Sequence, residues 1–222
     1  MKALLWKDYH VSRPIFIFGT VLMLVPYLIV GIAELVSWRR DGGSVRWIPA
    51  LMYCAFASLG LSILTIAAIA GNAFAGERVD RSAEFLGCLP VSHARIVLSK
   101  LSVALAAALA LWLVNLAVWY GLAPLAEVWP KPAADILLLA AITGLTFGSG
   151  WLASAMLNSA AISVGLALAA PATLGAVLGI IADLSTRPWA DGFHTAYLVL
   201  CVVLGLAALA LGSLYYVRRV EP

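Results

Sequence analysis

The sequence predicts an all-α integral membrane protein that crosses the bilayer with six helices. Of its 222 residues, 64% are hydrophobic and only 11% are charged, whereas a typical soluble domain is about 45–50% apolar and about 25% charged. The apolar residues gather in stretches that each supply the roughly 20 residues needed to cross a hydrocarbon core. The charged residues gather between these stretches, most of all between the second and the third. The whole chain, 1–222, is therefore expected to form a single membrane domain.

The first residues, 1–14, predict an interfacial helix that precedes the first span. On a helical wheel one side of this segment is apolar and the other is basic, the pattern of a helix that lies in the membrane surface. The apolar side comprises Met1, Leu4, Leu5, Tyr9 and Val11, and the basic side comprises Lys2, Lys7, His10 and Arg13. Asp8 and Trp6 interrupt the pattern, so a disordered start is the alternative.

Six spans are predicted after this segment, with short connections between them. They are Ile15–Trp38, Ile48–Ala75, Ile96–Leu122, Ala134–Leu157, Ala160–Leu184 and Tyr197–Val217. A tight turn at Asn158 and Ser159 joins the fourth span to the fifth. Pro26 and Pro171 lie near the middles of the first and fifth spans, where a proline bends the helix because it donates no backbone hydrogen bond. Such a bend either lines a pathway or serves packing.

Two pairs of glycines predict close contacts between helices. Gly144 and Gly148 are four residues apart in the fourth span, and Gly175 and Gly179 repeat that spacing in the fifth. Glycines spaced in this way let the backbones of neighbouring membrane helices approach each other.

The lysines and arginines predict the orientation of the chain in the membrane, because short cytoplasmic loops carry an excess of them. Of the 14 such residues, nine fall on the side that holds both termini and five on the opposite side. Both termini and the loop 76–95 are therefore expected in the cytoplasm, and the chain is expected in the cell's inner (plasma) membrane.

The residues offer little catalytic chemistry. No Gly-Lys dipeptide occurs, so a phosphate-binding loop of the GxxxxGK type is absent, and the cysteines Cys54, Cys88 and Cys201 show no metal-ligand spacing. The basic residues are dispersed, which gives no footprint for nucleic acid. Asn115 is expected in the middle of the third span, and with Pro26 and Pro171 it is a candidate for the lining of a pathway. A process that requires energy would have to receive it from outside the bilayer.

The segment Gly76–Lys100, GERVDRSAEFLGCLPVSHARIVLSK, is the most charged part of the chain and the largest predicted cytoplasmic loop. Its residues Asp80–Leu89 are expected to form a short amphipathic helix, which Pro90 ends. The apolar side of this helix comprises Val79, Ala83, Phe85, Leu86 and Leu89. Glu77 and Arg81 are four residues apart, a spacing that supports a helical turn. Such a helix either docks into a groove of a partner or lies among the lipid headgroups.

This segment resembles the loop of the ABC-2 type membrane proteins, the permease subunits of one class of ABC exporters. In that family a Glu-Arg pair is followed by a second Glu with Leu, by Leu-Pro-Val-Ser and a basic residue, and by a Lys at the start of the next span. The matching residues here are Glu77-Arg78, Glu84 with Phe85-Leu86, Leu89-Pro90-Val91-Ser92, Arg95 and Lys100. Ser82-Ala83 replaces the family's usual glycine, and His93 stands where many members carry arginine. The N-terminal segment and the six spans are similar to the family as well.

The resemblance implies a permease subunit that is not itself an enzyme and binds no cofactor. It would pair with a second permease subunit, identical or related, and with two copies of a cytoplasmic ABC ATPase that hold ATP and Mg²⁺. The loop would be the coupling helix that receives the motion of the ATPase. The contact residues that it implies are Glu77, Arg78, Arg81, Glu84, Phe85, Leu86, Leu89 and Pro90. An apolar pathway would suit an amphipathic substrate. The alternative is a membrane protein that transports nothing and anchors or regulates a cytoplasmic partner through the same loop.

Overall fold

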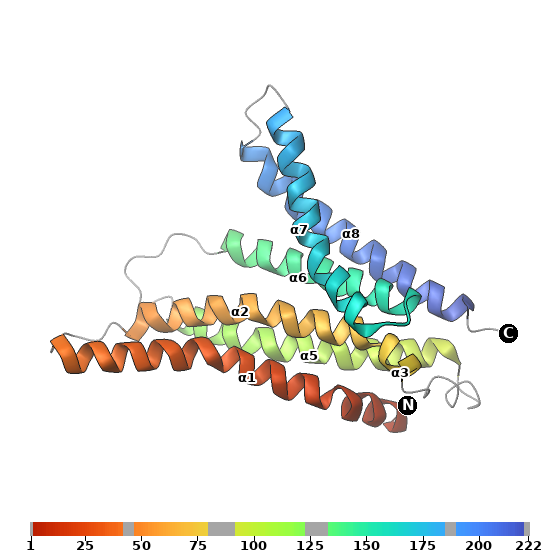
Figure 1. Ribbon diagram of the computed structural model, residues 1–222, viewed down its shortest axis with the longest axis horizontal. Helices are drawn as coiled ribbons and strands as arrows, with labels where there is room; N and C mark the ends of the chain where they lie inside the picture. Colours follow the sequence, from red (N-terminus) through yellow and green to blue (C-terminus); the bar gives the residue numbers. More distant parts are fainter. Residues whose placement is uncertain (1, 42–46, 80–91, 123–132, 185–189, 220–222) are drawn as a thin grey trace.

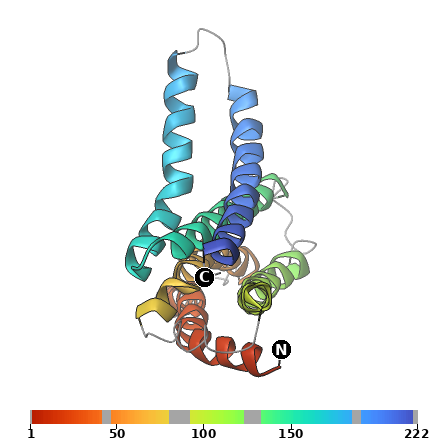
Figure 2. The ribbon, with the colours of Figure 1, turned by 90° about the vertical axis from the view of Figure 1, so that its right-hand side faces the viewer.

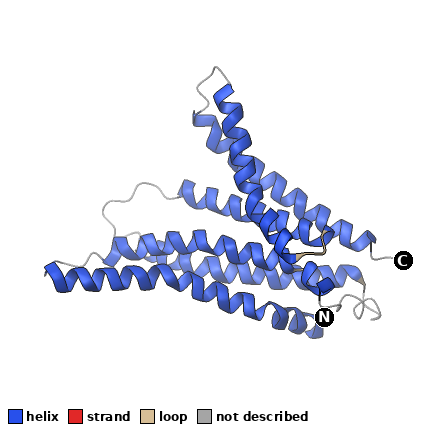
Figure 3. Ribbon diagram, viewed as in Figure 1, coloured by secondary structure: helices blue, strands red, loops and turns tan. Residues whose placement is uncertain are grey.

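Six helices of the computed structural model are long and apolar enough to cross a membrane, which confirms the predicted number of spans. The structure describes residues 2–41, 47–79, 92–122, 133–184 and 190–219, and within these ranges it contains no strand (Figure 3). The helices are α1 (Lys2–Asp41), α2 (Trp47–Asn72), α3 (Ala75–Val79), α5 (His93–Leu122), α6 (Ala133–Met156), α7 (Ala160–Leu184) and α8 (Ala190–Arg219). All of these helices except α3 have the length and composition of membrane spans, so the chain is a multi-pass membrane protein.

The helices form two groups that meet along α2. Helices α1, α2 and α5 pack against one another and lie side by side along the length of the molecule (Figure 1). Helix α6 lies over α2 and packs most extensively against α8, while α7 contacts α2 and α6. The far ends of α7 and α8 rise away from the other helices (Figure 2). We call these groups the α1–α2–α5 group and the α6–α7–α8 group.

Both groups contribute to one end of the molecule, which we call the α3 end. It holds the first turns of α1, the short helix α3, the start of α5 and the last turns of α8 (Figure 1). Aromatic side chains pack at this end: the ring of Phe74 lies 4.8 Å from that of Trp151 and 4.3 Å from that of Tyr216, centroid to centroid. Both ends of the described chain therefore lie on the same side of the helices, as an even number of spans requires.

Helix α1 differs from the prediction, because it is continuous from Lys2 to Asp41 and contains Pro14. The segment 1–14 was expected to be an interfacial helix before the first span; its described residues are helical and continue into that span without a break. A proline costs a helix one backbone hydrogen bond. The first turns are held in line by contacts of Asp8 with α5, described below, which offset that loss.

The other helix boundaries lie within three residues of the predicted spans, except that α8 begins at Ala190, seven residues before the predicted start at Tyr197. Helix α2 ends at Asn72, and the two-residue turn that follows leads into α3, whereas the prediction continued the span to Ala75. The turn predicted at Asn158 and Ser159 is confirmed, and the hydroxyl of Ser159 accepts a hydrogen bond from the amide of Ile162 at 3.4 Å. Ser159 therefore acts as the N-cap of α7.

The first predicted glycine pair lies where α6 meets α8. A Cβ atom on Gly148 would overlap the carbonyl oxygen of Gly205, and one on Gly205 would lie 2.8 Å from the carbonyl oxygen of Gly144. The two backbones therefore touch, as the spacing predicted. The second pair makes no such backbone contact: a Cβ atom on Gly175 would lie 3.5 Å from the ring of Tyr197 in α8, and one on Gly179 would meet no atom within 4 Å.

Candidate functional site

The helix α3 is held in place by a side chain of α6. The backbone amides of Phe74 and Ala75 donate hydrogen bonds to the hydroxyl of Ser154, at 2.8 and 3.1 Å. The first amides of a helix have no partner within the helix itself, so a side-chain oxygen that accepts from them stabilises the helix start. Ser154 is completely buried and fixes the point where the chain leaves α2. The segment 80–91 begins directly after α3.

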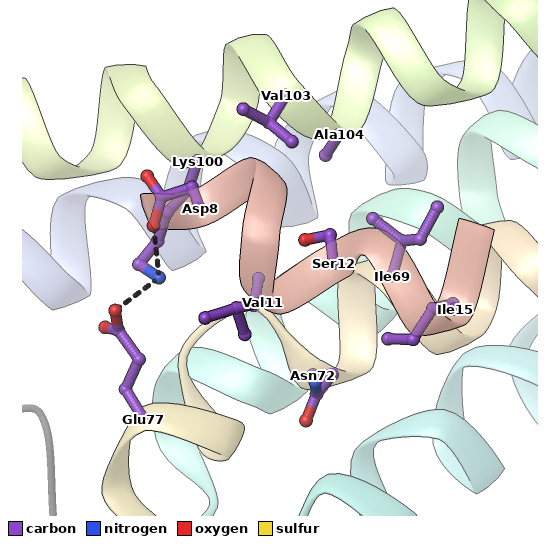
Figure 4. Close-up of a pocket in the computed structure, with 11 residues that line it drawn as sticks. Asp8, Val11, Ser12, Ile15, Ile69, Asn72, Glu77, Lys100, Val103 and Ala104 are labelled. Atoms are coloured by element: carbon purple, nitrogen blue, oxygen red, sulfur yellow. Dashed lines mark ion pairs between the residues drawn. The ribbon is translucent and has the colours of Figure 1, made fainter. Parts of the chain in front are cut away.

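Glu77 connects α3 to the α1–α2–α5 group. Its Oε1 atom lies 2.6 Å from the Nζ atom of Lys7 in α1. The same atom lies 2.9 Å from the Nζ atom of Lys100 in α5 (Figure 4). The side chain of Glu77 is only 6% exposed, and that of Lys100 only 7%. A buried carboxylate that receives two ammonium groups is well compensated, whereas the same carboxylate without them would carry a large desolvation cost.

Asp8 joins the same network from the first turns of α1. Its Oδ2 atom accepts a hydrogen bond from the hydroxyl of Ser99 at 2.6 Å, and its Oδ1 atom lies 3.5 Å from Lys100 Nζ. Lys100 therefore lies between two carboxylates from two different helices, and its ammonium group also lies 5.8 Å from the ring centroid of Phe74. The network contains two lysines and two carboxylates, so their formal charges cancel. We call Lys7, Asp8, Glu77, Ser99 and Lys100 the ion network.

A small pocket of about 40 Å³ adjoins the ion network. Asp8, Glu77 and Lys100 form its polar wall together with Ser12 and Asn72, and apolar side chains such as Ile15 close the rest (Figure 4). A pocket of this size and polarity is large enough for water. The ion network thus has room for solvent on one side, although three of its charged side chains are buried.

Arg78, the next residue along, connects α3 to the α6–α7–α8 group. Its guanidinium donates hydrogen bonds to the backbone carbonyls of Ala155 and Leu157, the latter at 2.7 Å, and to the side-chain oxygen of Asn158 at 3.3 Å. These carbonyls belong to the C-terminal end of α6, where the helix leaves backbone acceptors without partners and where its dipole favours a cation. Arg78 therefore serves as the cap of α6.

Glu77 and Arg78 are adjacent residues of α3, and their side chains bond this five-residue helix to both helix groups. A force that displaced α3 would act on α1 and α5 through Glu77 and on the α6–α7 turn through Arg78. Within the described ranges, no group of three or more histidine, cysteine, aspartate or glutamate side chains is placed to hold a metal ion.

Two of the predicted contact residues, Glu77 and Arg78, are in this site. The other six, Arg81, Glu84, Phe85, Leu86, Leu89 and Pro90, lie outside the described residues, as does the predicted helix Asp80–Leu89. Sequence reasoning missed the roles of Asp8, Lys7 and Ser99. A signal for Asp8 was present, because its carboxylate interrupts an otherwise amphipathic pattern, and an interruption of that kind fits a residue that faces a partner inside the protein.

The three predicted pathway residues lie between packed helices. Asn115 is 1% exposed, accepts a hydrogen bond from the hydroxyl of Tyr27 at 2.9 Å and donates one to the carbonyl of Leu111 at 3.0 Å. The carbonyl of Pro26 accepts from the thiol of Cys54 at 3.4 Å, and that of Pro171 accepts from the hydroxyl of Tyr197 at 2.9 Å. In this chain all three residues take part in contacts between helices.

No protein-family model, no curated protein and no solved structure matches this chain.

Proposed function

We propose that the chain is the membrane-spanning permease subunit of an ATP-driven exporter of the ABC-2 type. The observation that carries the proposal is the double attachment of α3. The residues directly before the segment 80–91 are bonded to α1 and α5 through Glu77 and to the end of α6 through Arg78. A loop that receives motion from a partner needs rigid attachment of this kind, because a loosely held loop would absorb the motion.

The proposal assigns each part a role. The segment 76–95 is the coupling loop and meets a cytoplasmic ATPase subunit, of which two copies bind ATP and Mg²⁺. A second permease subunit completes the path, and both termini face the cytoplasm of a cell whose inner membrane holds the complex. The substrate is amphipathic, because the buried carboxylates and the buried lysine of the described residues, Asp8, Glu77 and Lys100, lie together at the α3 end. A bare ion would need polar partners deep in the membrane.

The coupling role is tested with Phe85→Ala and Glu84→Ala in the full chain, co-expressed with an ATP-binding subunit encoded beside it. One buried aromatic side chain can dominate a small interface, so Phe85→Ala should weaken association by about 1–3 kcal/mol, roughly 5- to 150-fold. Glu84→Ala should leave the complex assembled and reduce substrate-stimulated ATP hydrolysis. Co-purification and turnover in liposomes measure the two effects.

The matched controls are Phe18→Ala and Glu34→Ala, which change the same residue types in α1, far along the chain from the loop. Phe18 is 64% exposed on a spanning helix. Both controls should assemble and hydrolyse ATP as the unmodified chain does. Normal association and turnover in both loop variants would instead favour a loop that lies among the lipid headgroups, and would contradict the coupling role.

The orientation is tested by labelling Cys88 with a charged maleimide that does not cross membranes. Cys54 and Cys201 are 1% and 0% exposed, so they should not react with such a reagent. Cys88 should react in inside-out vesicles and not in intact cells, and Cys88→Ala should abolish the signal. Labelling in intact cells alone would reverse the orientation and exclude the loop from contact with a cytoplasmic ATPase.

A further inference from the structure

The first turns of α1 have two opposite faces with different surroundings. On one face, Asp8 is 7% exposed and bonds to α5, and Ile15 lines the pocket beside the ion network (Figure 4). The other face is exposed and comprises Trp6, Tyr9, His10 and Arg13. At about 100° per residue these four side chains fall within an arc of about 100°, on the side opposite to Asp8 and Ile15. We call these four residues the Trp6 face.

The Trp6 face differs from both sides of the amphipathic helix that the sequence predicted. Lys7 was expected on the basic side, but its ammonium group lies 2.6 Å from the carboxylate of Glu77. Trp6, which interrupted the predicted pattern, is 67% exposed and stacks on His10, with the ring centroids 5.0 Å apart. Tyr9 was expected on the apolar side and is 51% exposed. The Trp6 face therefore presents aromatic rings together with a guanidinium group.

The position of Arg13 along α1 sets the depth of this face in the membrane. The 20 residues 14–33 that follow Arg13 carry no charge. At about 1.5 Å per residue they extend over about 30 Å, which is the thickness of the hydrocarbon core. Tyr9 precedes Arg13 by four residues, or about 6 Å along the helix, and the headgroup layer on each side of a bilayer is about 5–8 Å thick. The Trp6 face therefore lies at the level of the headgroups.

The exposed charges at the α3 end are all basic among the side chains that the structure describes there. Arg13 is joined by Arg95 of α5 and Arg218 of α8, which are also exposed. The two described carboxylates of this end, Asp8 and Glu77, are buried and compensated by lysines. The described surface around the Trp6 face therefore carries positive charge that no exposed carboxylate of those residues offsets.

The opposite ends of the helices carry exposed charges of both signs. Arg39 and Arg40 are exposed in the last turn of α1. Exposed carboxylates occur at the corresponding ends of two other helices, namely Asp135 in the first turn of α6 and Asp183 near the end of α7. The two ends of the molecule thus differ in the charge that they present to a membrane surface.

The side chains of the Trp6 face match the chemistry of a phospholipid headgroup. Tryptophan and tyrosine favour the interface between membrane and water, and arginine binds a phosphate group through two parallel hydrogen bonds. We propose that the Trp6 face binds the headgroup of an anionic phospholipid, with Arg13 on its phosphate and the rings of Trp6 and Tyr9 beside its glycerol. The positive surface around the face favours an anionic lipid over a zwitterionic one. The proposal does not depend on the exporter function, since it needs only the membrane setting of the helices.

The test measures lipid binding to the full chain, purified in detergent, by native mass spectrometry. Phosphatidylglycerol and phosphatidylcholine with identical acyl chains are titrated separately, so that a difference in affinity reports the headgroup. Phosphatidylglycerol should bind more tightly. Arg13→Gln should lower its affinity about fivefold, because one basic residue near an anionic lipid surface contributes about 1 kcal/mol. The affinity for phosphatidylcholine should change much less, since its choline offsets the charge of the phosphate.

Arg40→Gln is the matched control, because it removes the same charge from the other end of the same helix, and it should keep the preference for phosphatidylglycerol. Arg13→Lys keeps the charge without the paired hydrogen bonds and should give an intermediate affinity. Trp6→Ala should weaken the binding of both lipids by similar factors, because the indole ring recognises the interface and not the charge.

Two results would overturn the proposal. Equal affinities of the unmodified chain for the two lipids would do so, and would favour an acidic protein segment as the partner of the Trp6 face. Equal losses for Arg13→Gln and Arg40→Gln would also do so, because the preference would then follow the net charge of the chain and not a site on α1.

Discussion

Hydrogen bonds between helices occur in both helix groups, but the two groups differ in how closely their helix backbones approach at glycines. In the α1–α2–α5 group, polar side chains join the helices: the hydroxyl of Tyr27 donates to Asn115, and the hydroxyl of Ser58 donates to the carbonyl of Met23 at 2.8 Å. In the α6–α7–α8 group, the backbones of α6 and α8 meet at Gly148 and Gly205. Apolar burial drives helix association only weakly in lipid, because the lipid tails are themselves apolar. Hydrogen bonds and close packing remain, and the α6–α7–α8 group combines them, because the indole of Trp151 in α6 also donates to the hydroxyl of Ser213 in α8 at 3.1 Å.

The ion network is a third kind of contact, and its loss should have the largest effect. Lys100→Met removes the cation that lies between Asp8 and Glu77. Removing one partner of a buried ion pair costs about 3–5 kcal/mol, because it leaves a buried charge poorly compensated. The free energy of unfolding, measured by titration with a denaturing detergent in lipid micelles, should fall by about that amount.

The control for this variant is Lys7→Met, which removes a lysine of the same network. The Lys7 side chain is 31% exposed, and a pair that water reaches contributes much less. Its loss should therefore be clearly smaller than that of Lys100→Met. Equal losses would mean that burial does not set the strength of the network and that α3 is held mainly by Ser154 and Arg78.

The glycine contact between α6 and α8 should give the next largest effect. Gly148→Ala places a methyl group where the carbonyl oxygen of Gly205 lies, so the two backbones must separate. Overpacking of this kind typically costs about 1–3 kcal/mol. Thermal unfolding followed by circular dichroism should show a lower transition temperature.

Gly179→Ala is the matched control for that contact, because its Cβ atom has open space. Alanine is the better helix former by about 1 kcal/mol, so this variant should be as stable as the unmodified chain or more stable. A loss of stability for Gly148→Ala together with no loss for Gly179→Ala would confirm that the effect at Gly148 comes from the backbone contact between α6 and α8 and not from helix propensity. A loss at Gly179 as large as that at Gly148 would contradict it.

The hydrogen bond between Tyr27 and Asn115 should give the smallest effect. Hydrogen bonds between membrane helices contribute about 0.6 kcal/mol on average, because the unfolded chain in the membrane also finds partners. A double-mutant cycle of Tyr27→Phe and Asn115→Ala should therefore yield a coupling energy near that value. The control is Tyr120→Phe, at a residue that is 58% exposed, and a cycle of it with Asn115→Ala should show no coupling.

The spans, the turn at Asn158 and the capacity of Gly144 and Gly148 for close approach could be predicted because each depends on residues close together in the sequence, whereas their partner Gly205 in α8 could not. A span needs only about 20 apolar residues in a row. The ion network could not be predicted in the same way, since Asp8 and Ser99 are 91 residues apart and Lys7 and Glu77 are 70 apart. The sequence shows that these side chains are charged or polar, but it does not show which of them bond to one another.

The sequence by itself therefore determined that the chain is helical, that it spans a membrane with six helices and where most of those helices begin and end. The reason is that the hydrocarbon core leaves a chain of this apolarity few other ways to satisfy its backbone hydrogen bonds. Only the tertiary structure decided that α1 runs unbroken through Pro14 and that Glu77 and Arg78, neighbours in the sequence, bond to opposite helix groups. Such partners are chosen by which helices pack together, and that packing depends on the shapes of whole helix faces and not on any short stretch of residues.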